Sequence, residues 1–163
     1  MKGQIKIIKE EGNFEVKLGE RTLDLINRLS KLSEEESDTL LKESSEILSH
    51  CINPVDTVGN ITGLVFGYVQ SGKTMSFTTL STLAIDNGFR VIIYLTGTKN
   101  NLLEQTTKRL RKDLQISSVN RRRYKVFQNP ISDVNGINTL SNALKIRSKP
   151  AILITILVQV IFK

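Results

Sequence analysis

The sequence has few of the residue types on which many common sites depend. It contains no tryptophan, three prolines, one cysteine (Cys51) and one histidine (His50) among 163 residues. A single cysteine cannot form an internal disulfide, and no Cys/His cluster is present that would hold a structural metal ion. A histidine-based catalytic triad or zinc site would need residues from outside the chain. We therefore expect His50 and Cys51 to lie near the end of a helix without a chemical role.

Long hydrophobic runs are also scarce. The run that stands out, Ala151 to Phe162, is too short to span a bilayer as a helix, which takes about 20 residues. The first residues have no apolar segment typical of a signal peptide. Because the run from Ala151 is rich in β-branched residues, it predicts a buried parallel strand. We expect a cytoplasmic protein that does not enter the membrane.

Acidic residues become scarce after residue 50. Residues 1–50 carry 8 Lys/Arg against 11 Asp/Glu, whereas residues 51–163 carry 15 against 5. The net charge of +7 therefore comes from the second part of the chain. Such an asymmetry is typical of contact with a polyanion, although solvated surface lysines would give the same composition.

The amino-terminal part predicts a pair of helices. Four apolar residues recur at helical spacing, and they are Leu23, Ile26, Leu29 and Leu32. Ser33 and Glu36 then have the spacing of a capping box, which predicts a second helix ending near Asn53-Pro54. Alternating apolar residues in the first twenty positions suggest a weak hairpin before these helices. We interpret residues 1–56 as an N-terminal helical segment that serves packing or docking.

From residue 57 onward, short apolar runs alternate with helical patterns. The expected strands are Ile61–Phe66, Arg90–Leu95, one beginning at Val126-Phe127, and the terminal run from Ala151. The expected helices are Lys73–Asn87, closed by Gly88, then Leu102–Leu114 and Ile137–Arg147. This alternation predicts an α/β fold with a mostly parallel sheet. We interpret residues 57–163 as a partial P-loop NTPase (RecA-like) domain.

A glycine-framed loop between the first expected strand and helix carries the clearest motif. The pattern Gly-x-x-x-x-Gly-Lys-Ser/Thr is met in full by Gly67, Tyr68, Val69, Gln70, Ser71, Gly72, Lys73 and Thr74. Glycines let successive N–H groups converge on a phosphate, and the helix that follows directs its positive dipole end to the same place. The lysine adds a mobile cation, and the Thr74 hydroxyl is placed to coordinate Mg²⁺. The motif predicts binding of a nucleoside triphosphate, most simply ATP, with Mg²⁺.

The acidic half of a hydrolase site is missing from the sequence pattern. A P-loop NTPase also needs a carboxylate at the end of another buried strand, to hold Mg²⁺ and position water. The last acidic residue, Asp133, lies in a turn-like sequence, and the terminal apolar run contains none. Asp56, Asp86, Glu104 and Asp113 are likewise not expected at strand ends. We therefore predict little or no hydrolysis.

The segment after the expected strand Arg90–Leu95 is suited to phosphodiester oxygens. It offers small hydroxyl and amide groups at the carboxyl end of a parallel strand, which is the ligand side of such a sheet. The stretch from Lys108 to Lys125 adds eight cations against one acid, Asp113. The candidate nucleic-acid contacts are Thr96, Gly97, Thr98, Lys99, Asn100, Gln105, Arg121, Arg122 and Arg123. A solvated helix face followed by a basic loop is an equally good interpretation of the cations.

The two motif segments together resemble a known family. Residues 67–74 (Gly-Tyr-Val-Gln-Ser-Gly-Lys-Thr) and 88–106 (Gly-Phe-Arg-Val-Ile-Ile-Tyr-Leu-Thr-Gly-Thr-Lys-Asn-Asn-Leu-Leu-Glu-Gln-Thr) look like the opening of endonucleases that carry a so-called Z-one domain. These bacterial proteins are related to superfamily 2 helicases and are associated with restriction or phage defence. The resemblance is best over residues 64–114. It implies that 67–74 is the ATP motif and that Thr96 to Gln105 corresponds to the helicase motif that grips a DNA strand.

The chain also departs from that family. Members are several times longer, with an acidic Walker B motif, a second RecA-like lobe and nuclease portions downstream. We expect this chain to correspond to the amino-terminal piece, since it ends inside an apolar run. By resemblance, its partners are DNA and the downstream lobes or a restriction or defence complex.

The residues leave three functions open. The first is the ATP-binding part of a DNA helicase or translocase linked to an endonuclease. The second is a degenerate fragment that binds nucleotide without catalysis. The third is a P-loop kinase acting on a small molecule, against which stands the lack of an arginine-rich lid segment paired with a downstream acid.

Overall fold

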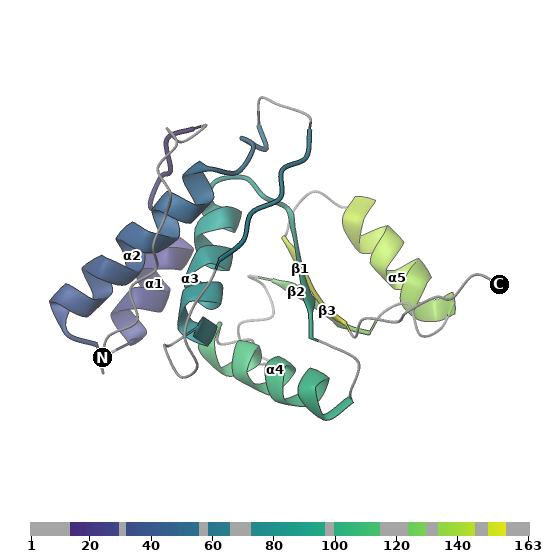
Figure 1. Cartoon of the computed structure of the whole chain (residues 1–163). Helices are drawn as coiled ribbons and strands as arrows, with labels where there is room; N and C mark the ends of the chain where they lie inside the picture. The colour runs from purple at the N-terminus through teal and green to yellow at the C-terminus, as the bar shows by residue number, and fades with distance from the viewer. Residues whose placement is uncertain are drawn as a thin grey trace. The chain divides into compact units, whose positions relative to one another are not determined.

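The computed structural model describes residues 14–29, 32–55, 59–65, 73–96, 100–114, 124–129, 134–145 and 150–155. Within these ranges the chain forms five α-helices and a three-stranded parallel sheet (Figure 1). The predicted α/β class with a parallel sheet is therefore confirmed. The chain divides into two compact units, the first ending at Phe89 and the second beginning at Arg90.

Three helices build the first unit. They are α1 (Glu20–Arg28), α2 (Glu34–Ser49) and α3 (Lys73–Asp86), and both α1 and α2 pack against α3 (Figure 1). All three were predicted, α1 by its apolar spacing, α2 by its capping box and α3 as the helix between the glycine loop and Gly88. The sequence placed α3 with the domain that begins at residue 57, whereas the structure groups it with the two amino-terminal helices. His50 is the C-cap of α2, as expected.

Hydrogen-bonded caps define the start of α2 and the end of α3. At the start of α2, the Glu36 N–H donates to Ser33 Oγ at 3.2 Å, and the Ser33 N–H donates to Glu36 Oε2 at 3.0 Å. The predicted capping box is thus confirmed. After α3, Gly88 adopts a φ of 100°, a left-handed conformation that glycine adopts without strain. The Phe89 N–H then reaches the Ala84 carbonyl at 3.0 Å, which completes a Schellman cap and ends the helix.

Two elements predicted near these helices are not found in the parts of them that the structure describes. The strand predicted for Ile61–Phe66 is wrong for its described part, because residues 59–65 contain no strand and Leu64 is 91% exposed. A strand needs a neighbour for its N–H and C=O groups, and no described strand pairs with this segment. Residues 14–19 form no part of the suggested hairpin, and the rest of its range, residues 1–13, lies outside the described residues. There the Lys17 backbone pairs with the Asn87 side chain instead.

The second unit is organised by its sheet. The strands are β1 (Val91–Leu95), β2 (Lys125–Gln128) and β3 (Ala151–Thr155), in the order β1-β3-β2 with both pairs parallel. The register sets Val91 beside Ala151 in one pair and Lys125 beside Ala151 in the other. The last strand in sequence is therefore the central strand. Its four described side chains, Ala151 to Ile154, are all buried.

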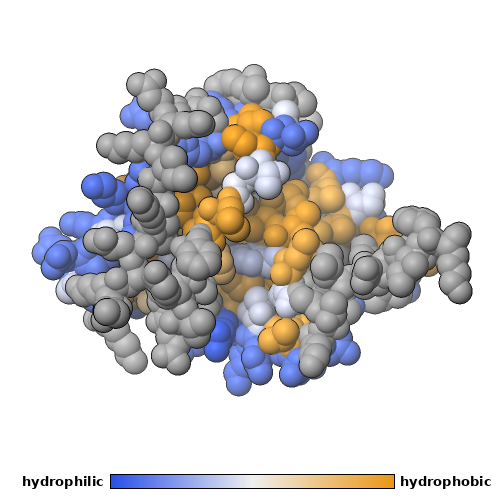
Figure 2. Space-filling model, viewed as in Figure 1, coloured by the Kyte–Doolittle hydropathy of each residue, from blue (hydrophilic) through white to orange (hydrophobic). Residues whose placement is uncertain are grey.

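Helices connect the parallel strands, as a parallel sheet requires. α4 (Asn100–Asp113) follows β1 and packs against β3, and α5 (Val134–Lys145) follows β2. The predicted helices at 102–114 and 137–147 are thus confirmed, with α5 beginning three residues earlier. β1 is less covered than β3, since Ile93 is 57% and Leu95 62% exposed. Figure 2 shows apolar side chains of the protein on its surface, bordered by hydrophilic ones.

The capping box provides a direct test of this fold. Replacing Ser33 with alanine removes the acceptor for the Glu36 N–H, so we expect Ser33→Ala to lower the free energy of unfolding by about 1 kcal/mol. Ser37→Ala, one turn into the same helix, is the matched control and should cause no loss, because alanine is the better helix former. Urea unfolding followed by circular dichroism measures both. Equal stabilities for the two variants would contradict the cap assignment.

Candidate functional site

The lysine of the P-loop motif is the first residue of α3. Lys73 and Thr74 therefore stand in the first turn, where backbone N–H groups have no partner within the helix. That turn contains no acidic residue of its own that would compete for these donors. The side chains of Lys73 and Thr74 and the loop residues Gly67 to Gly72 lie outside what the structure describes. The predicted start of the helix is confirmed, and the rest of the motif stays a prediction.

Downstream of this turn, α3 buries hydroxyl groups rather than a purely apolar face. Four hydroxyl residues on the helix are buried, namely Thr78, Thr79, Ser81 and Thr82. Ser81 Oγ donates to the Phe77 carbonyl at 2.8 Å, and Thr82 Oγ1 donates to the Thr79 carbonyl at 2.9 Å. These two bonds satisfy the Ser81 and Thr82 hydroxyls without water, whereas the buried Thr79 Oγ1 has no hydrogen-bond partner among the described residues. These small residues belong to the helix against which α1 and α2 pack.

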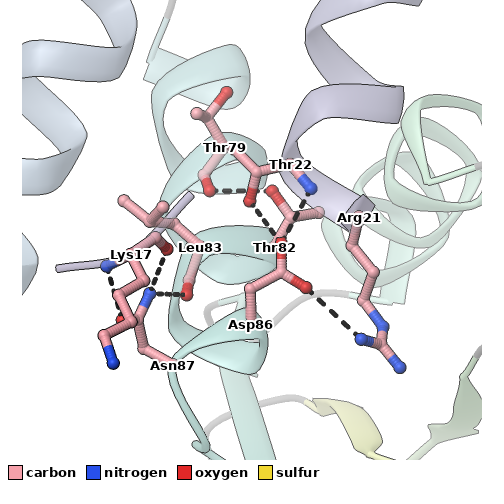
Figure 3. Close-up of polar contacts among 8 residues, drawn as sticks. All are labelled: Lys17, Arg21, Thr22, Thr79, Thr82, Leu83, Asp86 and Asn87. Carbon is pink, nitrogen blue, oxygen red and sulfur yellow. Dashed lines mark hydrogen bonds and ion pairs between the residues drawn. The ribbon is translucent and has the colours of Figure 1, made fainter. Parts of the chain in front are cut away.

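At its far end, α3 holds the start of α1 through one carboxylate. Asp86 Oδ2 accepts from both the N–H and the hydroxyl of Thr22, each at 2.9 Å (Figure 3). Asp86 Oδ1 accepts from Arg21 Nη1 at 3.3 Å, and the Asp86 side chain is only 3% exposed. Thr22 is the third residue of α1. The backbone N–H at this position normally donates its hydrogen bond to the side chain of the N-cap residue. Asp86 therefore caps α1 from a different helix.

The cap residue of α1 is a glycine for a visible reason. Gly19, the N-cap, has no side chain to accept a hydrogen bond. A Cβ atom built on Gly19 would lie 2.6 Å from Asp86 Cβ, and closer still to the carboxyl carbon. Any side chain at position 19 would displace the carboxylate. The absence of a side chain at Gly19 therefore leaves room for the Asp86 carboxylate, which takes the place of an N-cap side chain.

Asn87 extends the same contact to the chain before α1. Its Oδ1 accepts from the Lys17 N–H, and its Nδ2 donates to the Lys17 carbonyl, both at 2.8 Å. Nδ2 also donates to the Leu83 carbonyl of α3 at 2.8 Å. The amide therefore pairs with Lys17 as a neighbouring strand would (Figure 3). We call Asp86 and Asn87 with their partners Lys17, Arg21 and Thr22 the α3 clamp.

The second candidate segment lies in the other compact unit and is described in part. Thr96 follows β1 directly and is partly buried, and Asn100 and Gln105 are exposed on α4. Gly97, Thr98, Lys99 and Arg121 to Arg123 lie outside the described residues. Their proposed contacts with nucleic acid stay predictions. What the structure adds is that the motif's last residue, Gln105, points away from the buried side of α4.

The acidic residues and Cys51 are not arranged for catalysis in the described ranges. Asp86 belongs to the α3 clamp, and Glu104 and Asp113 lie in α4, so none of them is at a strand end, as predicted. No group of three or more His, Cys, Asp and Glu side chains in those ranges could hold a metal ion. Burial raises the pKa of the Cys51 thiol above its usual value, which lowers its thiolate fraction. Asp56 and Asp133 lie outside the described residues.

Sequence reasoning missed the α3 clamp. In the sequence alone, Asp86 is a carboxylate away from any expected strand end, and Asn87 is the end of an expected helix. One signal was present in the sequence. An acidic residue in the last turn of a helix is unfavourable against the helix dipole, so it implies a compensating partner. A helix whose N-cap is glycine lacks a side-chain acceptor for its first N–H groups, so α1 was a candidate for that partner.

The α3 clamp yields a stability prediction. Asp86→Asn keeps the shape of the side chain but removes its charge and turns one acceptor into a donor that faces other donors. We expect a loss of about 2 kcal/mol in the free energy of unfolding, since hydrogen bonds to a charged group contribute about 1.5–3 kcal/mol. Asp38→Asn on the exposed side of α2 is the matched control, with an expected effect within about 0.5 kcal/mol. Urea unfolding compares the two, and a loss no greater than the control's would refute the clamp's energetic role.

The last observations on the site concern membrane-spanning helices and similarity to known proteins. Among the described helices none is long and apolar enough to cross a membrane. No protein-family model, curated protein or solved structure matches the chain. The candidate site therefore rests on the chain's own residues and geometry.

Proposed function

We propose that the chain binds ATP through residues 67–74, as the amino-terminal part of a DNA helicase- or translocase-like endonuclease. The observation that carries the first half of this proposal is that α3 begins at Lys73, the lysine of the motif. A phosphate-binding loop needs a helix that opens at that residue, because the first-turn N–H groups and the dipole then face the anion. The family assignment rests on the resemblance of residues 67–74 and 88–106.

The residue types in the first turn of α3 suit a triphosphate. It carries no acidic residue that would repel the anion. Lys73 would contribute a cation to the outer phosphates, and Thr74 a hydroxyl oxygen to Mg²⁺. When bound, the nucleotide would supply a phosphoanhydride bond. The protein's part is to hold that phosphate by N–H groups and one ammonium group.

ATP binding should depend on Lys73. We expect Lys73→Ala to weaken ATP binding at least a hundredfold, because the variant loses the only side-chain cation of the motif. Lys42→Ala, which removes an exposed lysine from α2, is the control and should bind like the wild type. Isothermal titration calorimetry with Mg-ATP measures both. Equal affinities for Lys73→Ala and wild type would remove the basis for a phosphate-binding loop.

Hydrolysis should be slow or absent in the isolated chain. None of the described strand ends carries a carboxylate that would complete a Mg²⁺ and water site. A steady-state phosphate-release assay on the pure protein checks this expectation, with Lys73→Ala as the background. Turnover that disappears in Lys73→Ala would contradict it and would direct attention to Asp133.

A further inference from the structure

The helix that begins at the motif lysine is held, within the first unit, by the two amino-terminal helices. α3 packs against α1 and α2, and it buries Thr78, Thr79, Thr82 and Leu83. Of its 14 residues, six are serine or threonine. These residue types favour caps and turns over helix interiors, and a helix of this length is only marginally stable by itself in water. The helical state of α3 therefore depends on the packing of its neighbours.

α1 is the smaller of these two neighbours. It has nine residues, of which Thr22 and Leu25 are buried, whereas α2 has sixteen. Its N-cap, Gly19, supplies no side-chain acceptor, so the cap of α1 depends on α3. A short helix with few buried side chains belongs to the parts of a protein that open locally at low free energy. Opening of α1 therefore requires less free energy than unfolding of the whole unit.

Opening of α1 would also change the carboxyl end of α3. Asp86 would lose the N–H and the hydroxyl of Thr22 and the guanidinium group of Arg21 (Figure 3). Its carboxylate would then face the negative end of the α3 dipole without compensation. Because helix formation is cooperative, the loss of packing and of these donors lowers the helical population of α3 as a whole. The state in which α1 is docked therefore has the better formed α3.

A bound phosphate would distinguish these two states through the first turn of α3. The N–H groups of that turn point together at an anion only when the helix is formed. A ligand that binds one of two states more tightly shifts the population toward that state. The coupling is reciprocal, so the docked state also binds the ligand more tightly by the same factor. The α3 clamp and Lys73 are thus linked although they lie at opposite ends of the helix.

We propose that the docking of α1 on α3 is a conformational switch coupled to nucleotide binding at residues 67–74. Bound nucleotide favours the docked helix, and loss of nucleotide allows α1 to open. No contact between α1 and the nucleotide is required, because α3 carries the coupling. The switch rests on the proposed function, since it is a regulation of the same phosphate site.

Hydrogen exchange of single amides, followed by NMR with and without saturating Mg-ATP, tests this coupling. The Leu25 N–H reports on α1 and the Ser44 N–H on α2, since both residues are buried within their helices. Without nucleotide, the protection factor of Leu25 should be at least about tenfold lower than that of Ser44, because α1 opens locally. Saturating Mg-ATP should raise the Leu25 protection factor about tenfold, because the open state binds nucleotide more weakly. Lys73→Ala should show no such increase.

Thr22→Val tests whether the α3 clamp holds the switch. This change keeps the branched shape of the side chain but removes a hydroxyl that donates to Asp86. It should lower the Leu25 protection factor about tenfold, because a hydrogen bond to a charged group is lost. The matched control is Thr39→Val, the same chemical change at an exposed position of α2, which should leave Leu25 unchanged. Mg-ATP should still raise the protection of Leu25 in Thr22→Val.

The outcomes separate the switch from the proposed function. If calorimetry shows bound ATP but Leu25 exchange is unchanged, the open and docked states bind alike and the coupling alone is refuted. Equal protection of Leu25 and Ser44, raised equally by ATP, would mean that α1 opens only together with the whole unit, which also refutes the switch. Absence of ATP binding by the wild type would refute the proposed function, and the switch with it.

Discussion

The first unit depends on one buried carboxylate. Asp86 is unfavourable where it stands, because a negative charge at the carboxyl end of α3 faces the negative end of the helix dipole. It is retained by donors from α1: a backbone N–H, a hydroxyl and a guanidinium group. Each helix end thereby neutralises the other. The same contact fixes the height at which α1 sits along α3, since only the first turn of α1 presents these donors.

The second unit depends on burial rather than on polar contacts. β3 is flanked on both edges by parallel partners, and its four described side chains are excluded from water. Among the described strands, β1 and β2 each pair with β3 alone, and their side chains are less covered. Much of the cohesion of this unit therefore comes from residues 151–154. A polar substitution there would leave an unsatisfied group in the core, which usually costs more than the loss of apolar area alone.

The helices and the parallel strands were predictable because their signals are local. The capping box at Ser33, the left-handed glycine at Gly88 and the apolar spacing of α1 and α4 each act within a few residues. The position of the run from Ala151 at the centre of the sheet was not predictable, because strand order depends on pairing between distant segments. The strand expected at Ile61 failed for the same reason. Its composition suits a strand, but composition does not supply a neighbour.

The candidate sites were predictable to different degrees. The opening of α3 at Lys73 followed from the glycines before it, and the structure agrees. The exposed side of α4 could be drawn on a helical wheel from sequence, but which side is buried required the contact with β3.

The mutual dependence of Gly19 and Asp86 has a consequence for the history of this chain. A side chain at position 19 and a carboxylate at position 86 exclude one another, although the two positions belong to different helices. Homologous chains that carry a side chain at position 19 should therefore lack the carboxylate at position 86, and chains that keep Asp86 should keep Gly19. Such covariation provides a criterion for recognising divergent relatives even where the rest of the sequence has lost visible similarity.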